Sequence, residues 1–390
     1  MKAYLNSIID EQVNRSLSLK KLIPYPIYPT LSGVAERCTN ILQEQIDLLN
    51  AIKSELPFRD DSNIKDLFRQ IRICARDISH VEYYGLPALY YKTDEVGLLN
   101  QILLSIHNEI KLPFPHPAVC CTSNKYYFSV PLTNTIFVPL GESEFLLHLP
   151  DLYHELGHYV LVNMMNELRL KPVKEAYEKS LLVINNYFDD LVRSKKREYG
   201  PKEILYSIDR IREQWTEYWM VEFFCDLFAV YALGPAYVWS HLHLTTKISS
   251  DVYSLSVLLA QTHPSDDSRM KVLLEGLKLM SFDDEIKQIE NKWNEMIKFL
   301  PAPATMYQYA FPSELLKNIA KIVLDALKQS GLSLVTKENW YNNKNANEMR
   351  FLFNEAWDRF WRKSGAEFRA WEESKIVELK KQVKSTLINS

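Results

Sequence analysis

Two histidines four residues apart, His154 and His158, constrain this chain more than any other feature of its sequence. On an α-helix, residues at this spacing lie on one face, so both imidazoles can reach the same metal ion. Glu155 lies about 100° further round the helix, where it can contact a zinc-bound water without being a ligand. The H-E-x-x-H pattern therefore predicts a helix that carries part of a zinc site, with Glu155 as general base.

The residues around this motif favour a buried helix. Pro150 suits a first helical turn, where the N–H that proline lacks would have no partner. Gly157 costs about 1 kcal/mol relative to alanine inside a helix, which indicates a crowded site that another group approaches closely. The alternative is a core helix in which the histidines and Glu155 are satisfied by hydrogen bonds alone.

A second pair of polar side chains, Glu222 and Asp226, interrupts a long apolar run. They are four residues apart and share a helix face, and a buried carboxylate requires a partner of opposite charge. We interpret Glu222 as the third protein ligand to zinc, and Asp226 as the acceptor of the other ring N–H of a ligand histidine. The alternative is that both acids pair with Arg or Lys across a helical interface. Glu213 and Glu217 are weaker candidates because their neighbours are more polar.

Composition narrows the class of protein. Only 10 of 390 residues are glycine, which indicates many helices and few tight turns, and the net charge of −3 gives no indication of nucleic-acid binding. The five cysteines are scattered without a C-x-x-C pair, as is typical of reduced thiols in a cytoplasmic protein. The longest apolar run, residues 219–239, carries two acids, so we expect a buried helix there and no membrane insertion.

The rest of the chain predicts helices and one small sheet. Residues 1–30 are expected to form an extended lead-in. Residues 118–140, rich in β-branched and aromatic side chains, predict two or three short strands, with Pro139 on an edge strand that could bind an extended peptide. Helices are expected over 33–56, 62–84 with Ser62 as N-cap, 95–110, 151 to about 170, 171–198 ended by Gly200-Pro201, 203–233, 251–262, 267–280, 283–299 and 313–330.

Three segments resemble, in this order, a known family of enzymes. They are His154-Glu155-Leu-Gly-His158, Glu222-Phe-Phe-Cys-Asp226 and Thr262-His263-Pro264-Ser-Asp-Asp-Ser-Arg269-Met270. The pattern is similar to that of gluzincin zinc metallopeptidases of the HtpX and CAAX-prenyl-protease type, without the membrane-spanning helices of that family.

The resemblance implies roles for seven residues. Zinc would be ligated by His154, His158 and Glu222. Glu155 would be the base, and Asp226 would hydrogen-bond to a ligand histidine on the side away from the metal. His263 would lie beside the site, where it could stabilise the oxyanion or occlude the free zinc position. Arg269 would also lie there, paired with Asp226 or a neighbouring acid.

We therefore expect a mainly α (α+β) protein of three regions. These are a helical N-terminal region at 1–115, a zincin-like metallopeptidase domain at 116–300 with a helical insertion at 166–205, and a helical C-terminal region at 301–390. The expected function is zinc-dependent hydrolysis of peptide bonds in protein or peptide substrates, with a possible regulatory partner bound by the helical flanks. The alternative is a helical interaction or regulatory protein with a structural or latent zinc site.

Overall fold

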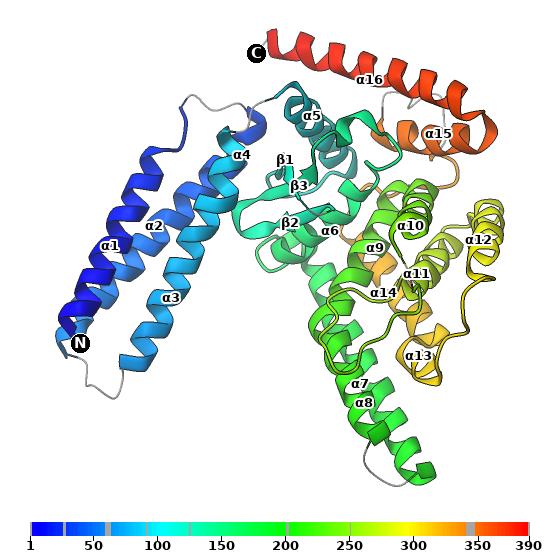
Figure 1. Cartoon of the computed structure of the whole chain (residues 1–390), viewed down its shortest axis with the longest axis horizontal. Coiled ribbons are helices and arrows are strands. Elements are labelled where there is room, and N and C mark those ends of the chain that lie inside the picture. Colours follow the sequence, from blue (N-terminus) through cyan, green and yellow to red (C-terminus); the bar gives the residue numbers. More distant parts are fainter. Residues whose placement is uncertain are drawn as a thin grey trace. The chain divides into compact units, whose positions relative to one another are not determined.

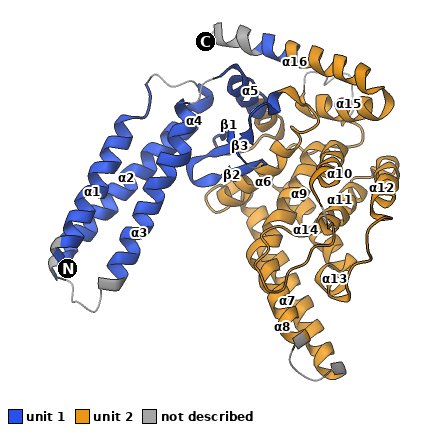
Figure 2. Cartoon of the chain, in the orientation of Figure 1, with its two compact units in different colours: residues 1–104, 115–143, 378–390 blue, residues 105–114, 144–377 orange. Residues whose placement is uncertain are grey.

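The computed structural model of the chain (Figure 1) describes residues 2–25, 29–58, 64–90, 93–124, 126–199, 203–249, 251–340 and 348–388. Within these residues the fold is mainly helical with one three-stranded sheet, which confirms the expected class at that level. The chain divides into two compact units (Figure 2): unit 1 is 1–104, 115–143 and 378–390, and unit 2 is 105–114 and 144–377. The expected three-region division had grouped 116–143 with the histidine pair, whereas here it groups with the N-terminal helices. The expected N-cap Ser62 and stop Gly200-Pro201 lie outside the described residues.

Within the described residues, the apolar faces of the first four helices of unit 1 share one core. The helices are α1 (Lys2–Lys21), α2 (Ser32–Glu55), α3 (Ile64–His80), α4 (Leu86–Tyr90) and α5 (Asp94–Ile110), whose last residues belong to unit 2. A π-helical turn, η4 (Val81–Gly85), joins α3 to α4.

The expectation of an extended lead-in over residues 1–30 is wrong, because α1 is a regular helix. Its buried stripe is Leu5, Ile9, Gln12, Ser16 and Leu19, at steps of four and three residues. Two of these five positions are polar, so the apolar pattern that signals a helix is interrupted in the sequence. Ser16 satisfies its hydroxyl within the helix by donating to the carbonyl oxygen of Gln12 at 2.9 Å, which allows it to be buried.

The sheet has the order β1-β3-β2, formed by β1 (Ala118–Ser123), β2 (Phe128–Val130) and β3 (Thr135–Pro139). β3 runs parallel to β1 and antiparallel to β2. Pro139 was expected on an edge strand, but it lies on the central strand, at the last paired position opposite Ser123. The pairing of β2 with β3 ends at Phe137, so the N–H that Pro139 lacks is not needed on that side.

Unit 2 is organised around α9 (Met220–Leu233), of which every residue except Val221 is buried. α6, α10, α11 and α14 all contact α9. The helices of the unit are α6 (Asp151–Asn163), α7 (Lys171–Tyr199), α8 (Glu203–Gln214), α9, α10 (Pro235–Ile248), α11 (Asp266–Leu279), α12 (Asp283–Ile297), α13 (Thr305–Ala310), α14 (Ser313–Gln329), α15 (Met349–Arg362) and α16 (Gly365–Ile388), whose last residues belong to unit 1.

Three expected helices of unit 2 have different limits in the structure. The histidine-bearing helix ends at Asn163, not near 170. The helix expected over 203–233 is interrupted by a π-helical turn, η8 (Trp215–Trp219). The apolar run 219–239 breaks at Gly234, whose φ of 90° disfavours other residues, and α10 begins directly after it. No helix within the described ranges combines the length and apolar composition that a membrane span requires.

Candidate metal centre

The histidine pair lies on α6 and comes together as its spacing predicts. The ring centroids of His154 and His158 are 5.2 Å apart. His154 is buried, whereas 21% of the His158 side chain is exposed. Glu155 is also buried on α6, and its charge acts on the Cys225 thiol of α9. Both imidazoles and the expected base therefore belong to one helix that packs against α9.

Gly157 allows α6 to contact the backbone of α9 directly. A Cβ added at this glycine would lie 2.8 Å from Cα of Cys225 and 3.0 Å from its Cβ, well inside van der Waals contact. The close approach that Gly157 indicated is thus that of a helix backbone. It places Glu222, which precedes Cys225 by about one turn, within reach of both imidazoles.

The Glu222 carboxylate lies among three imidazoles. Its Oε2 is 3.4 Å from Nε2 of His154 and 3.6 Å from Nε2 of His263. Its Oε1 is 3.9 Å from Nε2 of His158. These separations are long for hydrogen bonds, but the shortest is close to the roughly 3.3 Å between two ligand atoms on one tetrahedral zinc ion with bonds of ~2.0–2.1 Å.

The charge and hydrogen bonding of the Glu222 carboxylate also fit a metal ligand. Oε2 of Glu222 is buried and has no hydrogen-bond partner among the residues that the structure describes. Burial raises the pKa of Glu222, but the neighbouring His154 lowers it more, to about 2. A buried, anionic oxygen without a partner is costly, and a divalent cation held by these side chains would supply that partner.

Sequence reasoning missed a further donor, Cys225. One ligand atom from each of His154, His158 and Cys225 lies within 4.8 Å of the others, so this group could hold a metal ion. Burial raises the pKa of the Cys225 thiol well above its usual value, whereas ligation requires the thiolate. Glu222, already anionic, has no such proton to lose, and it remains the expected third ligand. The available signal for Cys225 was its place on α9 between Glu222 and Asp226.

Asp226 accepts hydrogen bonds from several groups behind the histidine pair. It is fully buried, and its Oδ1 accepts from Nδ1 of His154 at 3.0 Å. That bond fixes the proton on Nδ1 and turns Nε2 toward Glu222. Arg269, on α11, donates from Nε and Nη2 to the two oxygens of Asp226, at 2.8 and 2.7 Å. Their ion pair lies where the family resemblance implied it.

Tyr237, on α10, is a second residue that sequence reasoning missed. Its hydroxyl donates to Oδ1 of Asp226 at 2.6 Å and lies 3.0 Å from Nδ1 of His154. Its position depends on the break at Gly234 that starts α10, which the apolar run did not reveal. Tyr237 helps to hold the carboxylate that orients His154.

The two histidines differ in proton affinity. Burial lowers the pKa of His154, but the hydrogen bond to Asp226 and the negative charges of Asp226 and Glu222 raise it more, to about 10. Burial and the charge of His154 lower the pKa of His158 to about 4. At neutral pH the metal-free pair therefore carries one positive charge, on His154, and a metal ion bound at Nε2 would have to displace the extra proton.

His263 reaches the site from a loop. Residues 251–262 were expected to form a helix, but they form turns. Asp251 and Ser256 accept from the main-chain N–H groups two and three residues further on, bonds that compete with a helix. Two side chains then hold this segment: Gln214 donates to the carbonyl oxygen of Ser256, and Trp219 to that of Gln261, both at 2.7 Å.

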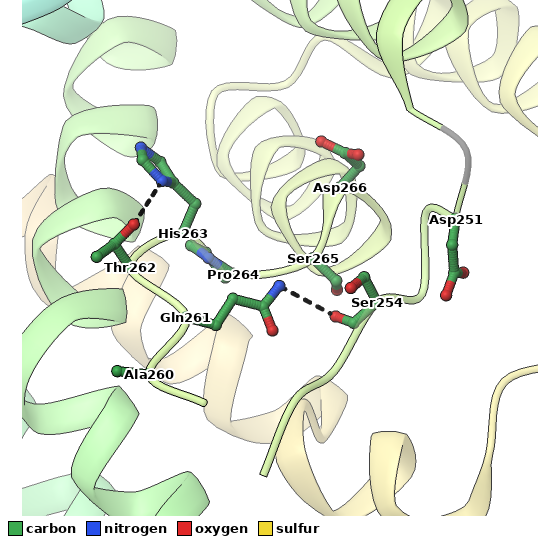
Figure 3. A pocket seen from close by; sticks show the side chains of 9 residues that line it. All are labelled: Asp251, Ser254, Ala260, Gln261, Thr262, His263, Pro264, Ser265 and Asp266. Carbon is green, nitrogen blue, oxygen red and sulfur yellow. Dashed lines mark hydrogen bonds between the residues drawn. The ribbon is translucent and has the colours of Figure 1, made fainter. Parts of the chain in front are cut away.

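A pocket of about 420 Å³ opens beside His263 (Figure 3). Nδ1 of His263 is 3.0 Å from the hydroxyl of Thr262, and Gln261 donates to the carbonyl oxygen of Ser254 at 3.4 Å. His263 therefore lines the pocket on one side and contacts Glu222 on the other. The lining residues are Asp251, Ser254, Ala260, Gln261, Thr262, His263, Pro264, Ser265 and Asp266.

No protein-family model, curated protein or solved structure matches this chain. Glu213 and Glu217, the weaker ligand candidates, are exposed on the surface of unit 2, so they do not compete with Glu222.

Proposed function

We propose that this protein is a zinc-dependent metallopeptidase that hydrolyses peptide bonds in protein or peptide substrates. The observation that carries the proposal is the buried Glu222 oxygen without a hydrogen-bond partner, placed between the Nε2 atoms of His154 and His263. The order of the three sequence motifs supports it.

His154, His158 and Glu222 would hold the metal. Two imidazoles and one carboxylate suit zinc, and they leave a position for water or substrate. Zinc in such a site supplies a Lewis acid that polarises a carbonyl group and lowers the pKa of water. Asp226 would keep Nε2 of His154 directed at a bound ion, because it accepts from Nδ1, while Arg269 and Tyr237 hold Asp226 in place.

Glu155 would move the proton. A buried carboxylate next to the ligand pair can take a proton from the attacking water and pass it to the leaving amine. His263, at the edge of the pocket, can donate a hydrogen bond to the developing oxyanion. The pocket beside His263 gives the substrate chain room on that side.

The test is cleavage of a peptide library by the zinc-loaded full chain. Glu155→Gln keeps the size of the side chain and removes the base, so we expect activity to fall by about a hundredfold or more, with zinc content unchanged. Glu217→Gln, an exposed glutamate, is the matched control. Equal cleavage by both variants would contradict a catalytic role of Glu155.

A second function has one specific observation in its favour. His263 lies as near Glu222 as the other histidines do, so four protein donors could close the site, as in structural or latent zinc centres. Cobalt substitution separates the two cases, because visible absorption and X-ray absorption count the protein nitrogens on the ion. Four protein donors together with no cleavage activity would favour a helical regulatory protein with a structural or latent site.

A further inference from the structure

Four of the eight tryptophans of the chain line one pocket in unit 2, which shares no lining residue with the pocket beside His263. The pocket has a volume of about 290 Å³, which suits a small ligand or a head group. Trp239 comes from α10, Trp357 and Trp361 from α15, and Trp340 from the turn that follows α14. Polar side chains complete the lining: Glu285, Gln288, Asn354, Asp358 and Arg362.

Three of the indoles form a continuous aromatic wall. The ring centroids of Trp239 and Trp361 are 4.8 Å apart, and each lies 6.4 Å from that of Trp357. Trp239 and Trp357 are buried, whereas Trp361 is 40% exposed. The wall is therefore held rigidly at its base and can be reached from solvent at its edge. The indole N–H of Trp357 is buried and finds no acceptor within the described part of the chain.

Two ion pairs lie beside the aromatic wall, and in each the acidic side chain is less exposed than the basic one. Glu285 pairs with Lys337 at 3.3 Å, and its side chain is 16% exposed against 39% for the lysine. Asp358 pairs with Arg362 at 2.8 Å, and the two side chains are 28% and 74% exposed. In both pairs the carboxylate lies deeper than its cation. A ligand that enters the pocket thus meets aromatic rings, two carboxylates that lie deeper than their cations, and the guanidinium of Arg362.

Hydrogen-bonding capacity distinguishes the ligand classes that such a pocket could take. A sugar stacks on tryptophan but needs several uncommitted polar partners. Asn354 offers none, because its amide is used by the main chain of Leu233, Arg350 and Ala236, and both acids are in ion pairs. Of the other polar groups named for this pocket, Gln288 and the N–H of Trp357 are the ones left to bind a sugar hydroxyl. A methylated ammonium group donates few or no hydrogen bonds and is bound by ring faces and negative potential.

From this arrangement we propose that the pocket formed by Trp239, Trp340, Trp357 and Trp361 binds a methylated ammonium group. The group could belong to a free choline-like molecule or to a methylated lysine of a polypeptide. The two sources present the same cation to the rings, and they differ in what extends from it.

The experiment titrates full-length protein with tetramethylammonium and choline chloride and follows tryptophan fluorescence, with sodium chloride added to equal ionic strength. The neutral control is 3,3-dimethylbutan-1-ol, which replaces the ammonium nitrogen of choline by carbon. We expect saturable binding of both cations and at least about tenfold weaker binding of the alcohol. A trimethyllysine peptide and its unmethylated form, titrated in parallel, separate a polypeptide source from a free one.

Variants test the location. Trp361→Leu, at an exposed position, is expected to weaken binding by about tenfold, and Trp361→Phe by less, since phenyl is the weaker cation–π partner. Trp371→Leu is the matched control, because Trp371 lies outside the pocket and stacks with Arg359. Equal affinity for the alcohol, tighter binding of a methyl glycoside, equal loss in Trp371→Leu or no saturation by either cation would each overturn the proposal.

Discussion

Replacing Gly157 by alanine tests the contact on which the candidate metal centre depends. The new Cβ would lie 2.8 Å from Cα of Cys225, roughly 0.7 Å short of the ~3.5 Å at which carbon atoms meet. The obstacle is backbone, so α6 and α9 must separate by a comparable amount. Metal ligands tolerate displacements of only about 0.2 Å. Because His154 and His158 are on one helix and Glu222 on the other, we expect zinc affinity to fall at least about tenfold.

Stability should change in the same variant. Alanine gains about 1 kcal/mol over glycine within a helix, while overpacking a core costs about 1–3 kcal/mol. The net loss is therefore up to about 2 kcal/mol of unfolding free energy, measured by urea denaturation with a chelator present. Gly97→Ala in α5 is the matched control, because a Cβ there meets nothing within 4 Å, and it should be neutral or stabilising.

Zinc affinity of both variants is measured by competition with a chromophoric chelator. If Gly157→Ala bound zinc as tightly as Gly97→Ala and unfolded at the same urea concentration, the helix contact would not position the ligands.

Three further outcomes are expected. Zinc binding near pH 7.5 should release about one proton, because the pKa of metal-free His154 is raised to about 10. The apparent zinc affinity should therefore rise about tenfold per pH unit between roughly pH 5 and 9. Calorimetry in buffers of different ionisation enthalpy measures the number of protons released, and a value of zero would contradict this prediction. Arg269→Met should cost about 3–5 kcal/mol in urea unfolding, because it removes the bidentate guanidinium from the fully buried carboxylate of Asp226, whereas Arg193→Met, which breaks an exposed pair with Asp190, should cost under about 1 kcal/mol. Tyr237→Phe should weaken zinc binding by about tenfold by loosening Asp226, while Tyr231→Phe, which removes a hydroxyl bonded to the carbonyl oxygen of Ala320, should leave it unchanged.

Local spacing predicted the parts of the site that lie on single helices. His154 and His158 share a face of α6, and Glu222 and Asp226 share one of α9, because a four-residue step fixes direction on any helix. Gly157 indicated that something approaches α6 closely, and the structure identifies the backbone of α9. These features follow from the sequence without knowledge of the fold.

Features that depend on contacts between distant elements were missed. Cys225 and Tyr237 enter the site only because α6, α9 and α10 pack together. Residues 251–262 look helical in sequence, but Gln214 and Trp219 hold them in turns. The helix α1 was overlooked because Gln12 and Ser16 occupy buried positions that periodicity reserves for apolar residues. In each case a tertiary contact outweighs a local pattern.

The π-helical turn η8 joins α8 to α9, and the continuous helix that results both holds the segment before His263 and positions Glu222. Such a turn inserts an extra residue and shifts the angular phase of everything after it by about 100°. Before the π-helical turn, Gln214 donates a hydrogen bond to the segment that leads to His263, and Trp219, the last residue of the turn, donates a second one. Three residues later, the Glu222 carboxylate faces the imidazoles. A force that pulled this segment outward would be transmitted to the Glu222 carboxylate through a single turn of helix, so a change in the shape of the pocket would also move Glu222 relative to the imidazoles.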